Sequence, residues 1–304
     1  MSPERVTVEV DGRELTLSNL DKVLYPDAGF TKRDVIDYYA RVADVMIPHL
    51  TQRPVTFKRF PHGVEGAFFF EKHIPSHAPT WVQRVTVARG ANSRSSDGVA
   101  VEYAVIADRP TLIWAANLAS LEFHVPQWRI DDESRLPQSP DLMVFDLDPG
   151  PGTTIVECCR VAGWLAEEIG RDGVTVKTSG SKGLQLYLRL ADRAVDSNEL
   201  AHELARKLER DHPDDVVSNM KKELRKNKVL IDWSQNSPAK TTIAVYSLRA
   251  RPRPTVSTPV SWDEIDSCAM TARPEDLEFV AADVLDRVDR VGDLFDVLLD
   301  RGTS

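Results

Sequence analysis

The chain has 304 residues, of which 42% are hydrophobic and 28% charged, as is typical of a soluble globular protein with one large domain or two small ones. No apolar run is long enough to span a bilayer, and three cysteines are too few for a disulfide framework, so we expect a reduced, cytoplasmic protein without a membrane partner. The net charge of −9 argues against broad nonspecific binding to nucleic acid, but it does not exclude local basic tracks that bind phosphate.

The first elements have clear apolar patterns. Residues 5–17 alternate between apolar and polar side chains and predict a β-hairpin. Residues 18–26 predict a short helix that Pro26 ends. Thr31 and Asp34 have the spacing of a capping box, so they predict the start of a longer helix.

Asn19, Lys22 and Lys32 gather near these two predicted helix starts. Free backbone N–H groups at a helix start favour anions, so the three side chains are candidates for a phosphate site. Ordinary surface residues need no such function, and the local pattern by itself favours that simpler interpretation.

A strand and an aromatic segment come next. Residues 54–60 predict a strand with Lys58 and Arg59 at its basic end, and three phenylalanines follow at 68–70 in a charged segment flanked by glycines. The aromatic rings either pack in the core or lie exposed, where they can stack on bases. Core packing is the commoner outcome, so at least Phe68 is expected to be buried.

Two further strands are predicted at residues 81–89 and 99–107, and an apolar helix at residues 111–121. The helix runs into a predicted strand at residues 122–128, which contains His124. A single histidine is more often a hydrogen-bonded core residue than a catalytic one.

Residues 142–150, Leu-Met-Val-Phe-Asp-Leu-Asp-Pro-Gly, carry the strongest chemical signal. Asp146 and Asp148 have i, i+2 spacing, which places both on the same side of a strand. Neighbouring carboxylates repel unless a cation lies between them, and hard divalent ions prefer such oxygen ligands. A turn would explain Asp148 alone, but Asp146 follows an apolar run, where burial without a partner is costly. The pair therefore predicts a metal site.

A second motif follows a predicted helix at residues 153–169 and a predicted strand at residues 174–177. Residues 178–183 read Thr-Ser-Gly-Ser-Lys-Gly, whose hydroxyls, glycines and lysine predict a phosphate cradle of backbone N–H groups and one cation. The residue order of a P-loop is absent. Residues 184–188 then alternate as a strand in which Gln185 faces away from its neighbours.

The next elements include a third aspartate at a strand end. Residues 197–210 predict an amphipathic helix, and residues 219–228 predict a strongly basic helix, which by itself is typical of a solvated surface. Residues 229–234 predict an apolar strand that carries Asp232 at its end. Asp232 is therefore a candidate for a third carboxylate of the metal site.

The remaining segments complete the pattern. Residues 241–248 predict a strand that leads to Arg249, and residues 261–300 predict helices rich in Asp and Glu. Strands and helices interleave throughout, but without the strict βαβ alternation of a doubly wound fold.

With these motifs combined, the chain resembles the polymerase domain of bacterial ligase D, within the archaeo-eukaryotic primase superfamily. The resemblance covers nearly the whole chain. The segments that carry it are DKVLYP (21–26), FFEK (69–72), HVPQW (124–128), VFDLDPG (144–150), TSGSKGL (178–184), DWSQN (232–236) and YSLR (246–249).

The resemblance implies an α/β (α+β) primase-like fold, in which a mixed β core flanked by helices carries the active site. It implies a single primase-polymerase domain over residues 1–304. Residues 1–130 would hold the 5′-phosphate pocket and the template loop, residues 131–260 the catalytic core, and residues 261–304 an acidic helical tail.

The implied activity is template-directed addition of NTPs or dNTPs at gaps, nicks and broken ends of DNA that carry a 5′ phosphate. The implied setting is bacterial repair such as non-homologous end joining, at the nucleoid, with a DNA ligase and Ku as partners. Two divalent ions, Mn²⁺ or Mg²⁺, would activate the primer hydroxyl and stabilise the transferring phosphoryl group.

The resemblance also assigns residues. Asp146, Asp148 and Asp232 would be catalytic and hold the ions. Residues that would hold the incoming triphosphate are His124, Ser179, Ser181, Lys182 and Arg249. Residues that would contact DNA are Asn19, Lys22 and Lys32 at the 5′ phosphate, Phe69 and Phe70 at the template, and Lys58, Arg59, Lys221, Lys222 and Arg225 along the backbone.

One position departs from the family pattern. Family members commonly have histidine where this chain has Gln185, and glutamine donates hydrogen bonds without carrying a charge. Two other functions remain open: a primase that starts chains without a primer, and a non-catalytic adaptor that binds 5′-phosphorylated DNA ends. Three converging carboxylates argue against the adaptor, which has no use for them.

Overall fold

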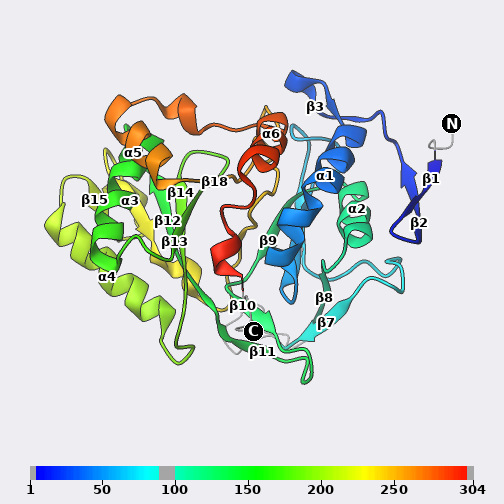
Figure 1. Cartoon of the computed structure of the whole chain (residues 1–304), viewed down its shortest axis with the longest axis horizontal. Coiled ribbons are helices and arrows are strands. Elements are labelled where there is room, and N and C mark those ends of the chain that lie inside the picture. Colours follow the sequence, from blue (N-terminus) through cyan, green and yellow to red (C-terminus); the bar gives the residue numbers. More distant parts are fainter. Residues whose placement is uncertain (1–4, 89–99, 300–304) are drawn as a thin grey trace.

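The computed structural model describes residues 5–88 and 100–299. Two six-stranded β-sheets form its centre, and helices cover them on both sides (Figure 1). This arrangement confirms the expected mixed β core flanked by helices.

The first sheet has the strand order β17-β9-β5-β8-β7, with β6 also paired to β5. Helices α1 (Lys32–Leu50) and α2 (Arg109–Asn117) bury their apolar sides in its core, where the Tyr39 ring lies 4.9 Å from that of Phe123. The predicted strands at 81–89 and 99–107 are present, although residues 89 and 99 lie outside the described part. The strands are β5 Pro54–Arg59, β6 Phe69–Glu71, β7 Arg84–Val87, β8 Val101–Val105, β9 Ser120–Val125 and β17 Thr242–Ile243.

The second sheet has the strand order β15-β16-β12-β14-β13-β18 and is antiparallel except between β15 and β16. Helices α3 (Ile155–Ile169), α4 (Ser197–Asp211) and α5 (Trp262–Thr271) contribute to its core. The strands are β12 Leu142–Pro149, β13 Val174–Thr178, β14 Leu184–Arg189, β15 Val216–Val217, β16 Val229–Asp232 and β18 Pro259–Val260. A ribbon of β10 (Trp128–Ile130) and β11 (Pro137–Pro140) connects the two sheets.

The alternation of side chains along β12 decides where its aspartates lie. Met143, Phe145 and Leu147 belong to the core of the second sheet, together with residues of α3 and α4. Val144 points the other way and joins the core of the first sheet. Asp146 and Asp148 are in phase with Val144, so both carboxylates face the side on which the first sheet lies.

The N-terminal region confirms the hairpin and the cap but not the short helix. Strands β1 (Arg5–Val10) and β2 (Arg13–Ser18) pair as expected. Thr31 and Asp34 form a capping box at the start of α1. Residues 18–26 do not form a helix: β3 (Val23–Tyr25) pairs with β4 (Phe30–Thr31), and a single 3-10 turn, η1 (Pro26–Ala28), joins them. The pairing of β3 and the burial of Leu24 and Tyr25 therefore override the helical pattern.

The predicted basic helix at 219–228 is wrong except for one 3-10 turn, η2 (Lys222–Leu224). The backbone of this segment binds the end of β12 instead. Gly150 N–H donates to the Lys228 carbonyl at 2.9 Å, and Asn227 N–H donates to the Pro151 carbonyl at 2.8 Å. Asn227 has a φ of 58°, which a helix cannot contain.

The predicted strand at 241–248 is also largely wrong, because only β17 (Thr242–Ile243) pairs with β9. Tyr246 has a φ of 63°, which reverses the chain, and its N–H donates to the Ser257 carbonyl at 2.8 Å. This turn brings Arg249 beside the second sheet. A further 3-10 turn, η3 (Trp233–Asn236), follows β16.

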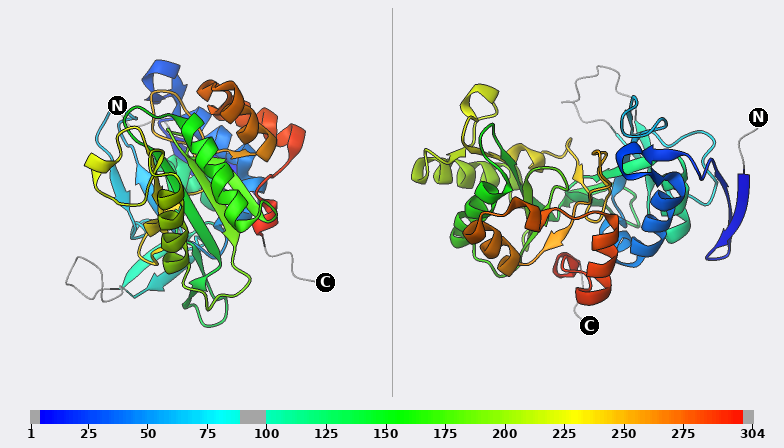
Figure 2. Two further views of the ribbon diagram at one scale, coloured as in Figure 1. Left: turned by 90° about the vertical axis from the view of Figure 1, so that its left-hand side faces the viewer. Right: turned by 90° about the horizontal axis from the view of Figure 1, so that it is seen from above.

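The acidic C-terminal segment is helical, as predicted, and it packs onto the rest of the molecule (Figure 2). Helix α5 buries Ile265 in the second core, and α6 (Ala281–Val291) buries Val284 in the first. Two 3-10 turns, η4 (Pro274–Leu277) and η5 (Asp296–Leu298), follow these helices. Within the described ranges, no helix combines the length and apolar character that crossing a membrane requires.

Candidate active site

Three carboxylates meet at the end of β12. Asp146 lies directly opposite Asp232 of β16 in antiparallel register, and Asp148 is two residues further along the same face of β12. One oxygen of each carboxylate lies within 4.8 Å of one oxygen of each of the others. The three aspartates predicted from strand ends are therefore brought together.

The electrostatics of these carboxylates fit a divalent cation. Burial and the charge of Asp148 raise the pKa of Asp146 to about 7. Burial and the charge of Asp232 also raise the pKa of Asp148, although Arg225 and Arg249 oppose this shift. Such shifts mean that the ionised forms repel each other, and a bound cation relieves that repulsion. Oxygen ligands of this kind suit Mg²⁺ or Mn²⁺.

Neighbouring polar groups fix the orientation of two of these carboxylates. Asp232 accepts hydrogen bonds from Ser234 N–H at 3.0 Å and from Gln235 Nε2 at 2.8 Å. Asp146 Oδ1 accepts from Gln185 Nε2 at 3.0 Å. The Gln185 carbonyl oxygen faces the other way and accepts from the buried Lys177 ammonium at 2.5 Å. Because an ammonium group only donates, Lys177 fixes which end of the Gln185 amide points to Asp146.

The Ser-Gly-Ser-Lys-Gly loop, for which the sequence predicts a phosphate cradle, follows β13 as a tight turn. Ser179 Oγ accepts from the N–H groups of Ser181 at 3.3 Å and Gly183 at 3.1 Å. Gly180 has a φ of 64°, and a Cβ on Gly183 would lie 2.0 Å from the Leu147 carbonyl oxygen, so both positions require glycine. Ser181 and Lys182 are exposed and border a groove of about 640 Å³.

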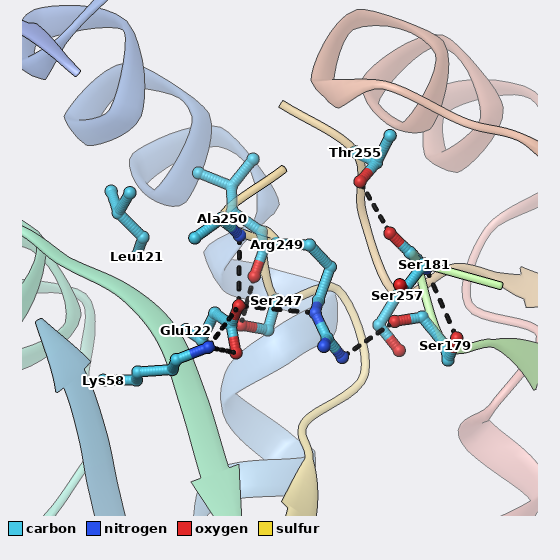
Figure 3. A network of polar contacts seen from close by, with 12 residues as sticks. Lys58, Leu121, Glu122, Ser179, Ser181, Ser247, Arg249, Ala250, Thr255 and Ser257 are labelled. Atoms are coloured by element: carbon cyan, nitrogen blue, oxygen red, sulfur yellow. Dashed lines mark hydrogen bonds and ion pairs between the residues drawn. The ribbon is translucent and has the colours of Figure 1, made fainter. Parts of the chain in front are cut away.

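Arg249 connects this cradle to the first sheet (Figure 3). Its Nη1 donates to the Ser179 carbonyl at 2.9 Å, and its Nε lies 3.5 Å from Glu122 Oε1 on β9. The other oxygen of Glu122 lies 3.0 Å from His124 Nε2. Contacts from the cradle through Arg249 and Glu122 thus reach His124, so the predicted nucleotide-binding residues occupy one continuous region.

The aromatic loop borders the same region. Phe69 and Phe70 are 43% and 56% exposed, and the Phe70 ring lies 5.8 Å from that of His124. The expectation that Phe68 is buried is wrong, because this side chain is 52% exposed. Phe60 already fills the core position beneath it, and Phe68 stacks on that ring at 5.2 Å.

The basic candidates differ in their surroundings. Lys58 lies 3.3 Å from Glu122, and Arg59 lies 2.9 Å from Glu71, so both charges are already paired. Lys221 and Lys222 are exposed in the loop that packs on the end of β12. Arg225 donates to the Met220 carbonyl at 2.7 Å, and its charge acts on Asp148.

Asn19, Lys22 and Lys32 lie together at the start of α1. Lys22 N–H donates to the Asn19 carbonyl at 3.1 Å, and Lys32 N–H donates to the Lys22 carbonyl at 2.8 Å. The side chain of Lys32 is buried, and burial with the charges of Lys22 and Arg59 lowers its pKa to about 8. In the described part of the chain, neither lysine forms an ion pair with a carboxylate. The Lys22 ammonium donates to the Pro61 carbonyl at 2.5 Å, and the Lys32 ammonium donates to the Ser18 carbonyl at 2.7 Å. Crowded cations whose charge is not offset by a carboxylate suit a phosphate.

Two buried residues of the site had no role in the sequence interpretation. Glu122 and His124 have i, i+2 spacing on a predicted strand, and this spacing predicts that their side chains lie on the same face. Lys177 lies in an apolar strand pattern, where a lysine is unusual and signals a buried partner. These patterns do not identify Lys58 and Arg249 as further partners of Glu122, or Gln185 as the partner of Lys177.

Comparisons with known proteins show which family this chain is similar to. Residues 31–295 match the family model described as the LigD primase-polymerase domain. The multifunctional non-homologous end joining protein LigD of Mycolicibacterium smegmatis is 45% identical over 283 residues, which cover 91% of this chain and 35% of that protein. The corresponding DNA repair protein of Mycobacterium tuberculosis is 44% identical over 298 residues, covering 94% of this chain and 37% of that protein. The chain thus spans little more than a third of these relatives.

A solved structure is similar over nearly its full length. The polymerase domain from Mycobacterium tuberculosis ligase D, in complex with DNA, has a TM-score of 0.84 and 43% sequence identity to this chain. The match covers 93% of this chain and 97% of that domain.

Proposed function

The chain belongs to the LigD primase-polymerase family, and on this basis we propose that it is a template-directed nucleotidyltransferase that adds ribo- or deoxyribonucleotides at gaps, nicks and broken ends of DNA. The proposed setting is repair by non-homologous end joining, for which a relative with 45% identity is named. The observation that carries the reaction is the convergence of Asp146, Asp148 and Asp232 close to a phosphate cradle.

We propose that these three carboxylates hold two divalent ions, Mn²⁺ or Mg²⁺. Their oxygens lie within 4.8 Å of one another, and the raised pKa of Asp146 reflects a need for positive charge. When bound, such ions make a primer 3′ hydroxyl more nucleophilic and offset charge on the transferring phosphoryl group. Gln185 and Ser234 orient Asp146 and Asp232 in advance, so less ordering is needed on binding.

The incoming NTP or dNTP would bind across the cradle. The exposed Ser181 hydroxyl and Lys182 ammonium can donate to phosphate oxygens, whereas the N–H groups of Ser181 and Gly183 already donate to Ser179 Oγ. Cations on either side of the loop would neutralise the charge of the phosphates. Arg249 already contacts the loop backbone, which supports the proposal that its guanidinium binds the triphosphate. The residues assigned to this role are His124, Ser179, Ser181, Lys182 and Arg249.

The DNA would bind along the face of the molecule that also binds the nucleotide. We assign the 5′ phosphate at the far side of a gap to Asn19, Lys22 and Lys32, and template stacking to Phe69 and Phe70, whose rings are exposed. The candidates for backbone contacts are Lys58, Arg59, Lys221, Lys222 and Arg225. Lys221 and Lys222 have the stronger case, because they are exposed while Lys58 and Arg59 are paired with carboxylates.

We further propose that the whole chain works as one domain. Residues 1–130 would bind the 5′ phosphate and template, residues 131–260 would carry catalysis, and residues 261–304 would brace both parts. Burial of α5 in one core and α6 in the other supports this arrangement. A DNA ligase and Ku would be its partners in the bacterial cytoplasm, since the relatives are multifunctional repair proteins of which this chain spans 35% and 37%.

Extension assays separate this function from its rivals. A gapped duplex, an unprimed single strand and a 5′-phosphorylated end are each incubated with nucleotides and Mn²⁺. Extension of the gapped primer supports the proposal, whereas products on the unprimed strand alone would identify a primase that starts chains. Binding to 5′-phosphorylated ends without any extension would identify a non-catalytic adaptor.

A further inference from the structure

Glu122 is a buried carboxylate that the proposed reaction does not use. It lies within β9 and is 1% exposed. Lys58 of β5, His124 of β9, and both Arg249 and Ala250 from the turn after β17 surround it. In Figure 3 its carboxylate lies between the Lys58 ammonium and the Arg249 guanidinium.

The contacts are close enough to keep this carboxylate ionised. Its oxygens lie 3.3 Å from Lys58 Nζ, 3.0 Å from His124 Nε2 and 3.1 Å from Ala250 N. Burial acts to raise the pKa of Glu122, but the hydrogen bond from His124 and the charges of Arg249, His124 and Lys58 prevail and lower it to about 2. A buried charge with this many partners is favourable only while the partners stay in place.

The Arg249 side chain depends on this charge. Its Nε is buried and, among the described residues, has no hydrogen-bond acceptor of regular geometry. The Glu122 carboxylate at 3.5 Å therefore holds it by charge. At the other end, Nη1 donates to the Ser179 carbonyl at 2.9 Å. The guanidinium is thus fixed between Glu122 and the cradle.

The Lys58 side chain depends on the same charge. Its ammonium lies 5.2 Å from the Phe60 ring, 4.6 Å from Phe68 and 5.7 Å from Phe70. Cation–π contacts of this length attract the rings to the ammonium. Phe70 belongs to the loop assigned to the template, so one carboxylate contacts partners on both the template side and the nucleotide side.

We propose that Glu122 is a positioning residue, whose negative charge holds Arg249 against the phosphate cradle and Lys58 among the template-loop aromatics. The inference rests on the proposed function, because it concerns the nucleotide and template sites assigned there. It adds that nucleotide affinity depends on a side chain that does not itself touch the nucleotide.

The test compares Glu122→Gln with the parent in the binding of ATP with Mn²⁺, and in extension of a gapped duplex. Glutamine keeps the shape but removes the charge, so the dissociation constant and KM for ATP should both rise about tenfold. The value of kcat at saturating ATP should change far less, because the carboxylate cluster is intact. A purely structural role would lower the melting temperature without this split.

Asp141→Asn is the matched control. Asp141 is 5% exposed and lies 2.6 Å from Arg53 and 2.8 Å from Arg129, away from the cradle. Its neutralisation should lower the melting temperature but leave the dissociation constant for ATP unchanged. A double-mutant cycle completes the test, because Glu122→Gln should add little to the effect of Arg249→Ala.

Parental ATP affinity in folded Glu122→Gln would overturn the inference, as would full additivity in the cycle. If Glu122→Gln does not fold, Glu122→Asp takes its place in the test. Its shorter side chain should weaken ATP binding severalfold. Parental ATP affinity in Glu122→Asp would overturn the inference. A parent that binds ATP but never extends gapped DNA would contradict the proposed function alone.

Discussion

Asp146 on β12 and Asp232 on β16 lie directly opposite each other across two antiparallel strands. Like charges in that position destabilise a sheet. Asp148 adds a third carboxylate within 4.8 Å. The metal-free protein therefore carries an electrostatic strain at this site, and a bound divalent cation would relieve it.

Asp146→Asn should stabilise the metal-free protein. The pKa of Asp146 is raised from 3.8 to about 7, so between these values the folded state holds a proton that the unfolded state has lost. Stability therefore falls as pH rises through this window and levels off above it. Asparagine does not ionise. Above pH 7 and in the presence of a chelator, the melting temperature of the variant should therefore be a few degrees higher than that of the parent. Calorimetry at several pH values measures both the shift and its pH dependence.

Asp141→Asn is the control for this experiment, because it should change the melting temperature in the opposite direction. The pKa of Asp141 is lowered by Arg53 and Arg129 despite its burial, so this carboxylate stabilises the fold when ionised. Asp141→Asn should therefore melt lower than the parent near neutral pH. A lower melting temperature for metal-free Asp146→Asn as well would show that the carboxylate cluster is not strained.

Lys182→Ala and Arg249→Ala should mainly raise KM for the nucleotide. Charge-assisted contacts with a triphosphate contribute about 1.5–3 kcal/mol, which corresponds to roughly ten- to hundredfold in KM. Lys207→Ala is the matched control, because this lysine lies on α4 and pairs with Glu168 at 2.7 Å. Nucleotide-dependent extension rates measure the effect, and an unchanged KM in both test variants would reject the cradle.

Lys22→Ala combined with Lys32→Ala should remove a preference for 5′-phosphorylated gaps. Two cations beside a doubly charged group should give the parent a preference on the order of tenfold, which salt weakens. Lys221→Ala combined with Lys222→Ala should instead weaken the binding of both DNAs, with and without the 5′ phosphate, to the same extent. Fluorescence anisotropy measures the affinity of each protein for duplexes with a 5′ phosphate and with a 5′ hydroxyl. If the parent binds the two duplexes equally well, the 5′-phosphate pocket is excluded.

Local patterns were sufficient to predict the carboxylate pair and the cradle. Asp146 and Asp148 share a strand face because of their spacing, and Gly180 and Gly183 mark a tight loop. The convergence of Asp232 with them depends on β16 pairing with β12, which strand patterns alone do not specify. The position of Asp232 at a strand end made it a candidate, and the resemblance to a family then implied that it joins the other two aspartates.

The elements that sequence analysis missed depend on tertiary contacts. Residues 219–228 have a helical composition, but hydrogen bonds from Gly150 and Asn227 hold them as a loop. Phe68 has the character of a core residue, yet Phe60 occupies the core position beneath it. In both cases a distant or neighbouring segment decides the outcome, and no local pattern encodes it.

The most direct test of the proposed reaction is Mn²⁺-dependent extension of a primer in a gapped duplex by the parent and by Asp148→Ala. The parent should extend the primer, and the variant should fall to background while binding the same DNA nearly as tightly, because it loses a metal ligand and no DNA contact. Asp172→Ala, which alters an exposed aspartate between α3 and β13, should behave as the parent. Extension by Asp148→Ala at the parental rate would contradict the assignment of the carboxylates as the catalytic centre.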